Sequence, residues 1–171
     1  MKRTNTLTQR DLCEAFDVPD TTLSSWLGKY EILTISRDPE TDLLSFGTID
    51  LVRLHVCSDL RREGAPGHQL RQAIEATDEA FRKAGGILRA YLLVIRSQIG
   101  KRFFVPLASD GLVVPQGKLP PGSTAGIFDL TEAWDRYTEC LEAGACRSGL
   151  SWSREQIGKA ALRTRKKLAR K

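Results

Sequence analysis

The sequence predicts an α+β fold made of two folded units and a basic C-terminal segment. Three observations lead to this expectation. Apolar residues recur at helical spacing through most of residues 1–84, short β-rich runs alternate with turn signals in residues 88–144, and residues 147–171 are rich in lysine and arginine. A chain of 171 residues has room for one or two small domains, which agrees with this division.

The first unit begins with two short helices joined by a tight turn. We expect the first helix over residues 8–16, where Thr8 can cap the N-terminus and Asp11 stands in the capping-box position. Pro19 has the fixed φ that suits a helix start, so residues 20–27 form the second helix. Its apolar residues fall on one face, which leaves four short polar side chains on the other: Thr21, Thr22, Ser24 and Ser25.

A β-ribbon and two longer helices complete this unit. Residues 33–35 and 43–46 flank a polar turn that contains proline, a pattern typical of a two-stranded ribbon. A third helix over residues 48–60 buries apolar side chains at three-residue steps and stops at Gly64. A fourth helix begins around residue 70 and ends at residues 84–86, where two glycines follow an alanine.

This ordered series of positions resembles the DNA-binding domain of the MerR family and of its smaller relatives, the phage and plasmid excisionases. The resemblance covers about two-fifths of the chain. It rests on the ribbon and on Val18, Thr22, Leu23, Trp26, Phe46, Asp50, Leu51, Leu54, Leu60, Gly64, Leu70 and Ile74. It implies a winged helix-turn-helix fold and a transcriptional regulator of bacterial, phage or plasmid type, whose second helix meets DNA.

The residues expected to contact DNA lie in two parts of the chain. They are Thr21, Thr22, Ser24, Ser25, Lys29, Arg37 and Arg53 in the first unit, and Arg163, Arg165, Lys166 and Lys167 in the basic segment. Residues 1–64 contain 8 Lys/Arg against 11 Asp/Glu, whereas residues 147–171 contain 9 against 1. Because phosphate neutralisation supplies much of the affinity for DNA, we interpret the segment as a polyanion-binding arm. The alternative is a solubilising tail.

Residues 88–144 predict a small antiparallel sheet covered by one helix. Strands are expected at residues 90–97, 102–108, 112–115 and 125–128, and the first three would form a meander with a hairpin turn at Asp110-Gly111. A helix at residues 132–141 would cover the sheet with Trp134, Tyr137 and Leu141. The expected role of this unit is oligomerisation or ligand sensing, because its continuous apolar run at residues 91–95 needs more cover than one helix provides.

The residues that could carry chemistry do not form the pattern of an enzyme, and we expect no catalytic site, cofactor or metal. The four cysteines are expected to remain thiols: Cys13, Cys57, Cys140 and Cys146. Cys140 and Cys146 do not have the spacing of a zinc site, and no histidine stands beside them. His55 and His68 lie on the third and fourth helices, where each is expected to be solvated or to touch phosphate.

Double-stranded DNA is the expected partner, and the second unit is expected to make the chain self-associate. A cytoplasmic protein without membrane contact is expected, because the sequence has neither an apolar run of membrane-spanning length nor a signal peptide. Two alternatives remain. One is an excisionase-like architectural factor; the other is a protein-interaction adaptor in which only the basic segment meets polyanions. RNA polymerase or a recombinase is the protein partner that a regulator or an excisionase would need.

Overall fold

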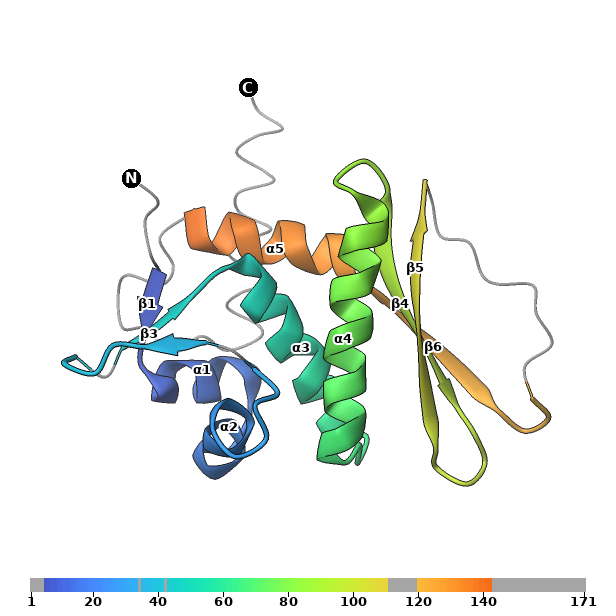
Figure 1. Ribbon diagram of the computed structural model, residues 1–171, viewed down its shortest axis with the longest axis horizontal. Helices are drawn as coiled ribbons and strands as arrows, with labels where there is room; N and C mark the ends of the chain where they lie inside the picture. Colours follow the sequence, from blue (N-terminus) through green and yellow to red (C-terminus); the bar gives the residue numbers. More distant parts are fainter. Residues whose placement is uncertain (1–4, 34, 42, 111–119, 143–171) are drawn as a thin grey trace.

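The computed structural model describes residues 5–33, 35–41, 43–110 and 120–142, and every structural statement below concerns these residues. They form an α+β fold with five helices and two three-stranded antiparallel sheets, which confirms the predicted class (Figure 1). The helices are α1 (Gln9–Phe16), α2 (Asp20–Leu27), α3 (Thr48–Arg62), α4 (Gly67–Ala84) and α5 (Leu130–Glu142). The strands are β1 (Asn5–Leu7), β2 (Ser36–Arg37), β3 (Leu44–Phe46), β4 (Arg89–Arg96), β5 (Arg102–Ser109) and β6 (Thr124–Asp129).

The ends of α1 and α2 follow the predicted signals. The Thr8 hydroxyl accepts a hydrogen bond from the Asp11 backbone N–H at 3.2 Å, and the Asp11 carboxylate accepts from the Thr8 N–H at 2.9 Å. This reciprocal pair is the predicted capping box. Asp17 ends α1 in the left-handed region with φ of 52°, and Pro19 stands immediately before α2. The Thr8–Asp11 capping box and Pro19 therefore define where these two helices of eight residues each begin.

The first sheet has the order β1-β3-β2 and contains a strand that was not predicted, β1. Leu33 and Ile35 do not belong to the predicted first strand of the ribbon, which begins at Ser36. The N–H groups of Ile32 and Leu33 both donate to the carbonyl of Trp26, at 2.9 and 3.2 Å. This turn takes the backbone of Leu33 away from the sheet, and the side chains of Ile32 and Leu33 are buried in the core.

The long helices α3 and α4 form the middle of the molecule (Figure 1). α4 begins at Gly67, a few residues before the expected start, because Pro66 precedes it in an extended conformation. It ends where predicted, at Gly85, whose φ of 58° suits glycine. Arg53 of α3 joins the two helices by donating to both carboxylate oxygens of Asp78, at 2.9 and 2.8 Å.

The second sheet has the order β5-β4-β6. The predicted antiparallel pairing of its first two strands is confirmed, because β4 pairs with β5 along Arg89–Arg96, and Tyr91–Arg96 of β4 pair with β6 on the other side. The predicted strand at residues 112–115 lies outside the described residues. β5 is an edge strand among the described elements, and it carries Pro106 opposite Leu92. The Pro106 carbonyl accepts a hydrogen bond from the Lys83 ammonium at 3.5 Å.

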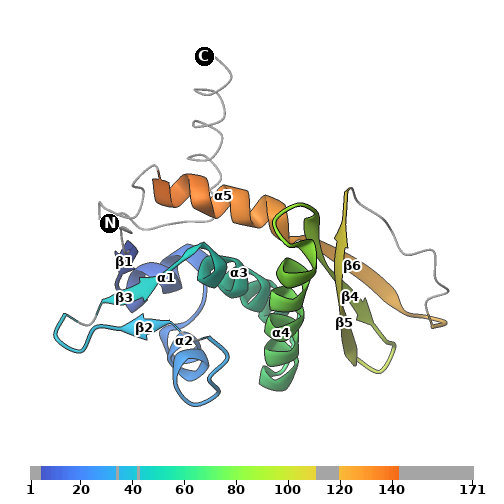
Figure 2. The ribbon, with the colours of Figure 1, turned by 45° about the horizontal axis from the view of Figure 1, so that its top comes forward.

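The helix that covers this sheet is α4, and the predicted role of the last helix needs correction. α5 packs on α3 and on the end of β4 (Figures 1 and 2). The ring centroid of Tyr137 lies 5.8 Å from that of Phe16 and 6.0 Å from that of His55. Trp134 turns away from the sheet towards Phe81 of α4, with 5.4 Å between ring centroids. The apolar stripe of α5 was predicted correctly, but its partner was not.

One hydrophobic core joins the five helices to strands of both sheets. Its buried side chains include Leu12 of α1, Leu23 of α2 and Leu51 of α3, together with Leu92 of β4 and Tyr137 of α5. The boundary predicted between residues 84 and 88 therefore does not separate two cores. Removal of the sheet and α5 would expose apolar surface on α3 and α4.

We predict that Tyr137→Ala lowers the free energy of unfolding of the whole chain by about 3–5 kcal/mol, because it leaves a cavity beside Phe16. Tyr137 is 2% exposed, whereas Tyr30 is 43% exposed. Tyr30→Ala is thus the matched control and should cost less than about half as much. Urea denaturation followed by circular dichroism measures both. Two separate transitions in the wild-type protein would contradict the single core.

Candidate nucleic-acid interface

The surface of α2 carries the polar side chains that the sequence singled out. Leu23 and Trp26 are buried beneath it, whereas Thr21 and Ser24 are exposed and Ser25 is half-buried. Because α2 has only two turns, these polar residues form a short ridge. A groove runs along each side of this ridge.

The first groove lies between α2 and the junction of α3 with α4, and has a volume of about 1010 Å³. From α2 it is lined by three of the predicted residues, Thr21, Thr22 and Ser25. The opposite wall carries charged and polar side chains of α3 and α4: Arg61, His68, Arg71, Gln72 and Glu75. The Arg71 guanidinium donates to the carbonyl of Tyr30, which holds the chain after α2 against α4.

The second groove lies between α1, α2 and the β2–β3 ribbon, and has a volume of about 700 Å³. Gln9 connects its walls. The Gln9 amide donates to the Asp20 carboxylate at 2.8 Å and to the Ser24 hydroxyl at 2.6 Å, while its oxygen accepts a hydrogen bond from Arg37. A single side chain thus fixes Ser24 of α2 and Arg37 of the ribbon relative to each other.

Basic side chains outnumber acidic ones in both grooves. The first groove contains Arg61, Arg71 and His68 against Glu75, and the second contains Arg10 and Arg37 against Asp20. Arg10 also pairs with Glu14 at 3.0 Å, but this pair is largely exposed and therefore weak. Within the described part of the chain, the Arg61 guanidinium has no ion pair. The fold thus gathers cations around α2, although residues 1–64 as a whole are acidic.

Arg53 does not belong to this surface, in contrast to the sequence-based assignment. It pairs with Asp78 at 2.8 Å and with Asp50 at 3.2 Å, and its side chain is 20% exposed. Burial disfavours its charged form, but the hydrogen bonds and charges of Asp78 and Asp50 outweigh this and raise the pKa of the guanidinium. Arg53 therefore braces α3 against α4 and is not available to phosphate.

The other predicted residues divide as follows. Thr21, Thr22 and Ser25 face the first groove, Ser24 and Arg37 face the second, and Lys29 is exposed after α2 with its ammonium 5.2 Å from the ring centroid of Tyr30. Arg163, Arg165, Lys166 and Lys167 lie outside the described residues. Sequence reasoning missed Arg61 and Arg71. Their positions at the facing ends of two predicted helices were the available signal, but only the crossing of those helices brings them to α2.

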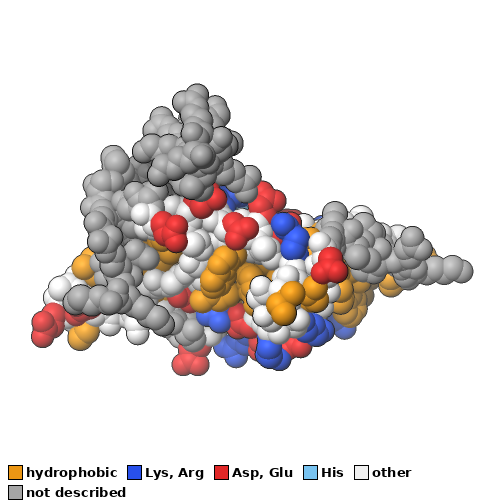
Figure 3. Space-filling model, turned by 90° about the horizontal axis from the view of Figure 1, so that it is seen from above, with side chains coloured by type: hydrophobic (Ala, Val, Ile, Leu, Met, Phe, Trp, Pro, Cys, Tyr) orange, Lys and Arg blue, Asp and Glu red, His pale blue; other side chains and the backbone are white. Residues whose placement is uncertain are grey.

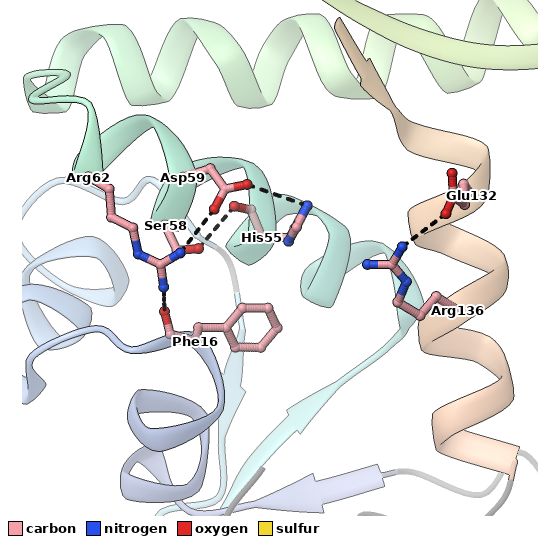
Figure 4. Close-up of polar contacts among 7 residues, drawn as sticks. All are labelled: Phe16, His55, Ser58, Asp59, Arg62, Glu132 and Arg136. Atoms are coloured by element: carbon pink, nitrogen blue, oxygen red, sulfur yellow. Dashed lines mark hydrogen bonds and ion pairs between the residues drawn. The ribbon is translucent and has the colours of Figure 1, made fainter. Parts of the chain in front are cut away.

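A row of polar contacts along α3 holds α1, and with it α2, in place (Figure 4). Arg62 donates to the carbonyl of Phe16 at 3.2 Å, and it pairs with Asp59 at 3.3 Å. On its other side Asp59 lies 3.7 Å from His55. Since Phe16 is the last residue of α1, this contact caps the helix end that leads into α2.

The described thiols are poorly suited to nucleophilic or metal chemistry. Burial, with smaller contributions from Asp20 and Glu14, raises the pKa of the Cys13 thiol to about 11, and burial also raises the pKa of Cys57. Among the described residues, no cluster of three His, Cys, Asp or Glu side chains could hold a metal ion. Cys146 and the side chain of Cys140 are not part of the description. None of the described helices is long and apolar enough to span a membrane.

Comparison with protein-family models found no match to this chain. Comparison with curated proteins found no significant match either.

We predict that Arg61 and Arg71 each neutralise one DNA phosphate. The double variant Arg61→Ala/Arg71→Ala should then reduce the slope of log affinity against log salt concentration by roughly 2 units, because each phosphate contact contributes about 0.9. Fluorescence anisotropy with a labelled duplex measures the slope. Arg82→Ala/Lys83→Ala, on two exposed residues of α4 far from α2, is the charge-matched control and should leave the slope unchanged. Equal slopes for all three proteins would remove the first groove from the interface.

Proposed function

We propose that this protein is a sequence-specific transcriptional regulator of bacterial, phage or plasmid type that binds double-stranded DNA through a MerR-like winged helix-turn-helix. The observation that carries the proposal is the polar ridge of α2 between two arginine-bearing grooves. An α-helix with its side chains is about 10–12 Å across, so α2 can enter a major groove about 12 Å wide. The ridge would meet base edges, and the flanking arginines would meet phosphates.

The two serines of the ridge are suited to different hydrogen-bond partners. The Ser25 hydroxyl donates to the carbonyl of Thr21 at 2.8 Å, so its lone pairs are left to accept from a base. The Ser24 hydroxyl accepts from Gln9, so its proton is left to donate. Ser25 therefore favours an amino group of a base in the major groove, whereas Ser24 favours a carbonyl or a ring nitrogen. This difference supports sequence reading beyond attraction to phosphate.

In this proposal the β2–β3 ribbon contacts DNA through its base and not through its tip. Arg37 lies at the base, facing the second groove. The tip carries Asp38 and Glu40, and hydrogen bonds from the Glu40 N–H and from Thr41 lower the pKa of Asp38. A charged tip of this kind repels phosphate. It favours a contact with a basic surface of RNA polymerase or a recombinase, as a regulator or an excisionase would need.

The basic segment completes the proposal. Residues 147–171 carry 9 Lys/Arg against 1 Asp/Glu, and we assign them to phosphate along the duplex beside the site read by α2. Arg163, Arg165, Lys166 and Lys167 would supply sequence-independent affinity, and α2 would supply specificity.

Selection of bound duplexes from a random pool tests this function directly. We predict that the wild-type protein enriches a defined site and that Ser25→Glu abolishes the enrichment, because a carboxylate in the first groove repels phosphate. Thr124→Glu, on an exposed residue of β6, adds the same charge far from α2 and should leave the selected site unchanged. If Ser25→Glu selects the same site as the wild type, α2 is not the reading element.

Self-association is the second part of the proposal, and the register of the sheet defines the face that would carry it. Phe104 packs against the core, on the side of α4. Phe103 and Val105 point to the opposite side, and Phe103 is 46% exposed. We therefore assign the proposed contact with a second copy to Phe103 and Val105 and not to Phe104.

We predict that Phe103→Asp shifts the intact protein towards monomer, because a buried carboxylate would oppose the apolar contact. Sedimentation or light scattering at tens of micromolar measures the shift. Tyr30→Asp, on an exposed aromatic residue after α2 and away from the second sheet, is the matched control for an added acidic group. A wild-type protein that stays monomeric at that concentration would exclude this face as a dimer interface.

A further inference from the structure

A third cavity lies where α3, α4 and α5 meet the turn between α4 and β4. Its volume is about 660 Å³, and known small-molecule sites measure about 300–1,000 Å³. Apolar side chains make up much of its wall: Ile49, Phe81, Ala84, Leu88 and Trp134. Figure 3 looks down on this end of the molecule and shows hydrophobic side chains gathered there with acidic groups beside them. We refer to it as the three-helix cavity.

The aromatic side chains of the three-helix cavity are incompletely covered. Phe81 and Trp134 pack with their ring centroids 5.4 Å apart, yet Trp134 remains 37% exposed. Tyr137, one turn later on α5, is 2% exposed, so the helix buries one aromatic ring and presents the other. Ile87, in the adjoining turn, is 90% exposed. Trp134 therefore keeps part of its ring surface available to a ligand in the cavity.

The charged groups of the cavity leave one carboxylate unbalanced. Arg53 and Asp78 line the wall but satisfy each other through two hydrogen bonds, at 2.9 and 2.8 Å. Asp135 also lines the cavity, next to Trp134 in the sequence, and its side chain is exposed. Within the described residues, its carboxylate forms no ion pair or hydrogen bond. The charge available to a ligand is therefore negative, and it lies beside two aromatic rings.

We propose that the three-helix cavity binds a small organic ammonium compound, whose apolar body lies against Phe81 and Trp134 and whose charged group faces Asp135. A cation is attracted both to a carboxylate and to the face of an aromatic ring. An anion would be repelled by Asp135, since Arg53 is already engaged. This assignment does not depend on DNA binding, because none of its residues lines the grooves beside α2.

Three probes of similar shape test the class of ligand on the full chain: phenethylammonium, 2-phenylethanol and 3-phenylpropionate. The indole N–H resonance of Trp134, assigned with Trp134→Phe, reports binding by NMR titration. Phenethylammonium is expected to shift it saturably in the millimolar range, with 3-phenylpropionate about tenfold weaker. Equal responses to all three probes, or no saturable shift with phenethylammonium, would overturn the proposal.

Two variants locate the cation. Asp135→Asn should weaken phenethylammonium about tenfold while leaving 2-phenylethanol unchanged, because it removes only the charge. Asp110→Asn, an exposed aspartate at the end of β5, is the matched control and should change neither. If Asp135→Asn binds phenethylammonium as tightly as the wild type does, the carboxylate is not the recognition element and the proposal fails.

Discussion

The burial of α3 on nearly every side is the constraint on which the rest of the structure depends. Seven of its residues are buried, and they are distributed around the helix: Leu51, Val52, Leu54, Val56, Cys57, Ser58 and Leu60. A helix whose buried side chains are distributed around its axis must be enclosed by other elements. α1, α4 and α5 provide this enclosure, and the second sheet packs behind α4. The position of α2, and hence of its polar ridge, follows from how α1 sits on α3.

The same constraint explains which parts of the fold the sequence could predict. Some helix ends were predictable because the residues that define them act on the backbone a few positions away. These residues are Thr8 with Asp11, Pro19 and Gly85. The element against which α5 packs was not predictable, because Tyr137 and Trp134 indicate an apolar stripe but not the surface that it covers. For Arg53 the decisive neighbour, Asp78, lies 25 residues away. The sequence around an arginine in a helix is the same whether its side chain faces solvent or a carboxylate from a distant part of the chain.

The candidate interface likewise contains residues that could be predicted from the sequence and residues that could not. Its α2 residues were found from the sequence because a short amphipathic helix shows its polar face directly. The cations of the first groove come from the facing ends of α3 and α4, and only the tertiary fold brings them beside α2. Net charge over residues 1–64 was misleading for the same reason. Much of the acid there lies at the ribbon tip or pairs with arginines of α3, whereas Arg61 and Arg71 face the groove.

Pro106 gives the outer edge of β5 a property that its apolar sequence would not suggest. Residues along a strand edge normally offer N–H donors to any further strand, and proline removes one of them. The carbonyl of Pro106 already accepts a hydrogen bond from Lys83 at 3.5 Å. A β-strand from another molecule therefore finds a broken ladder at this edge. This edge of the sheet is thus guarded against open-ended, amyloid-like growth, even when many copies crowd together.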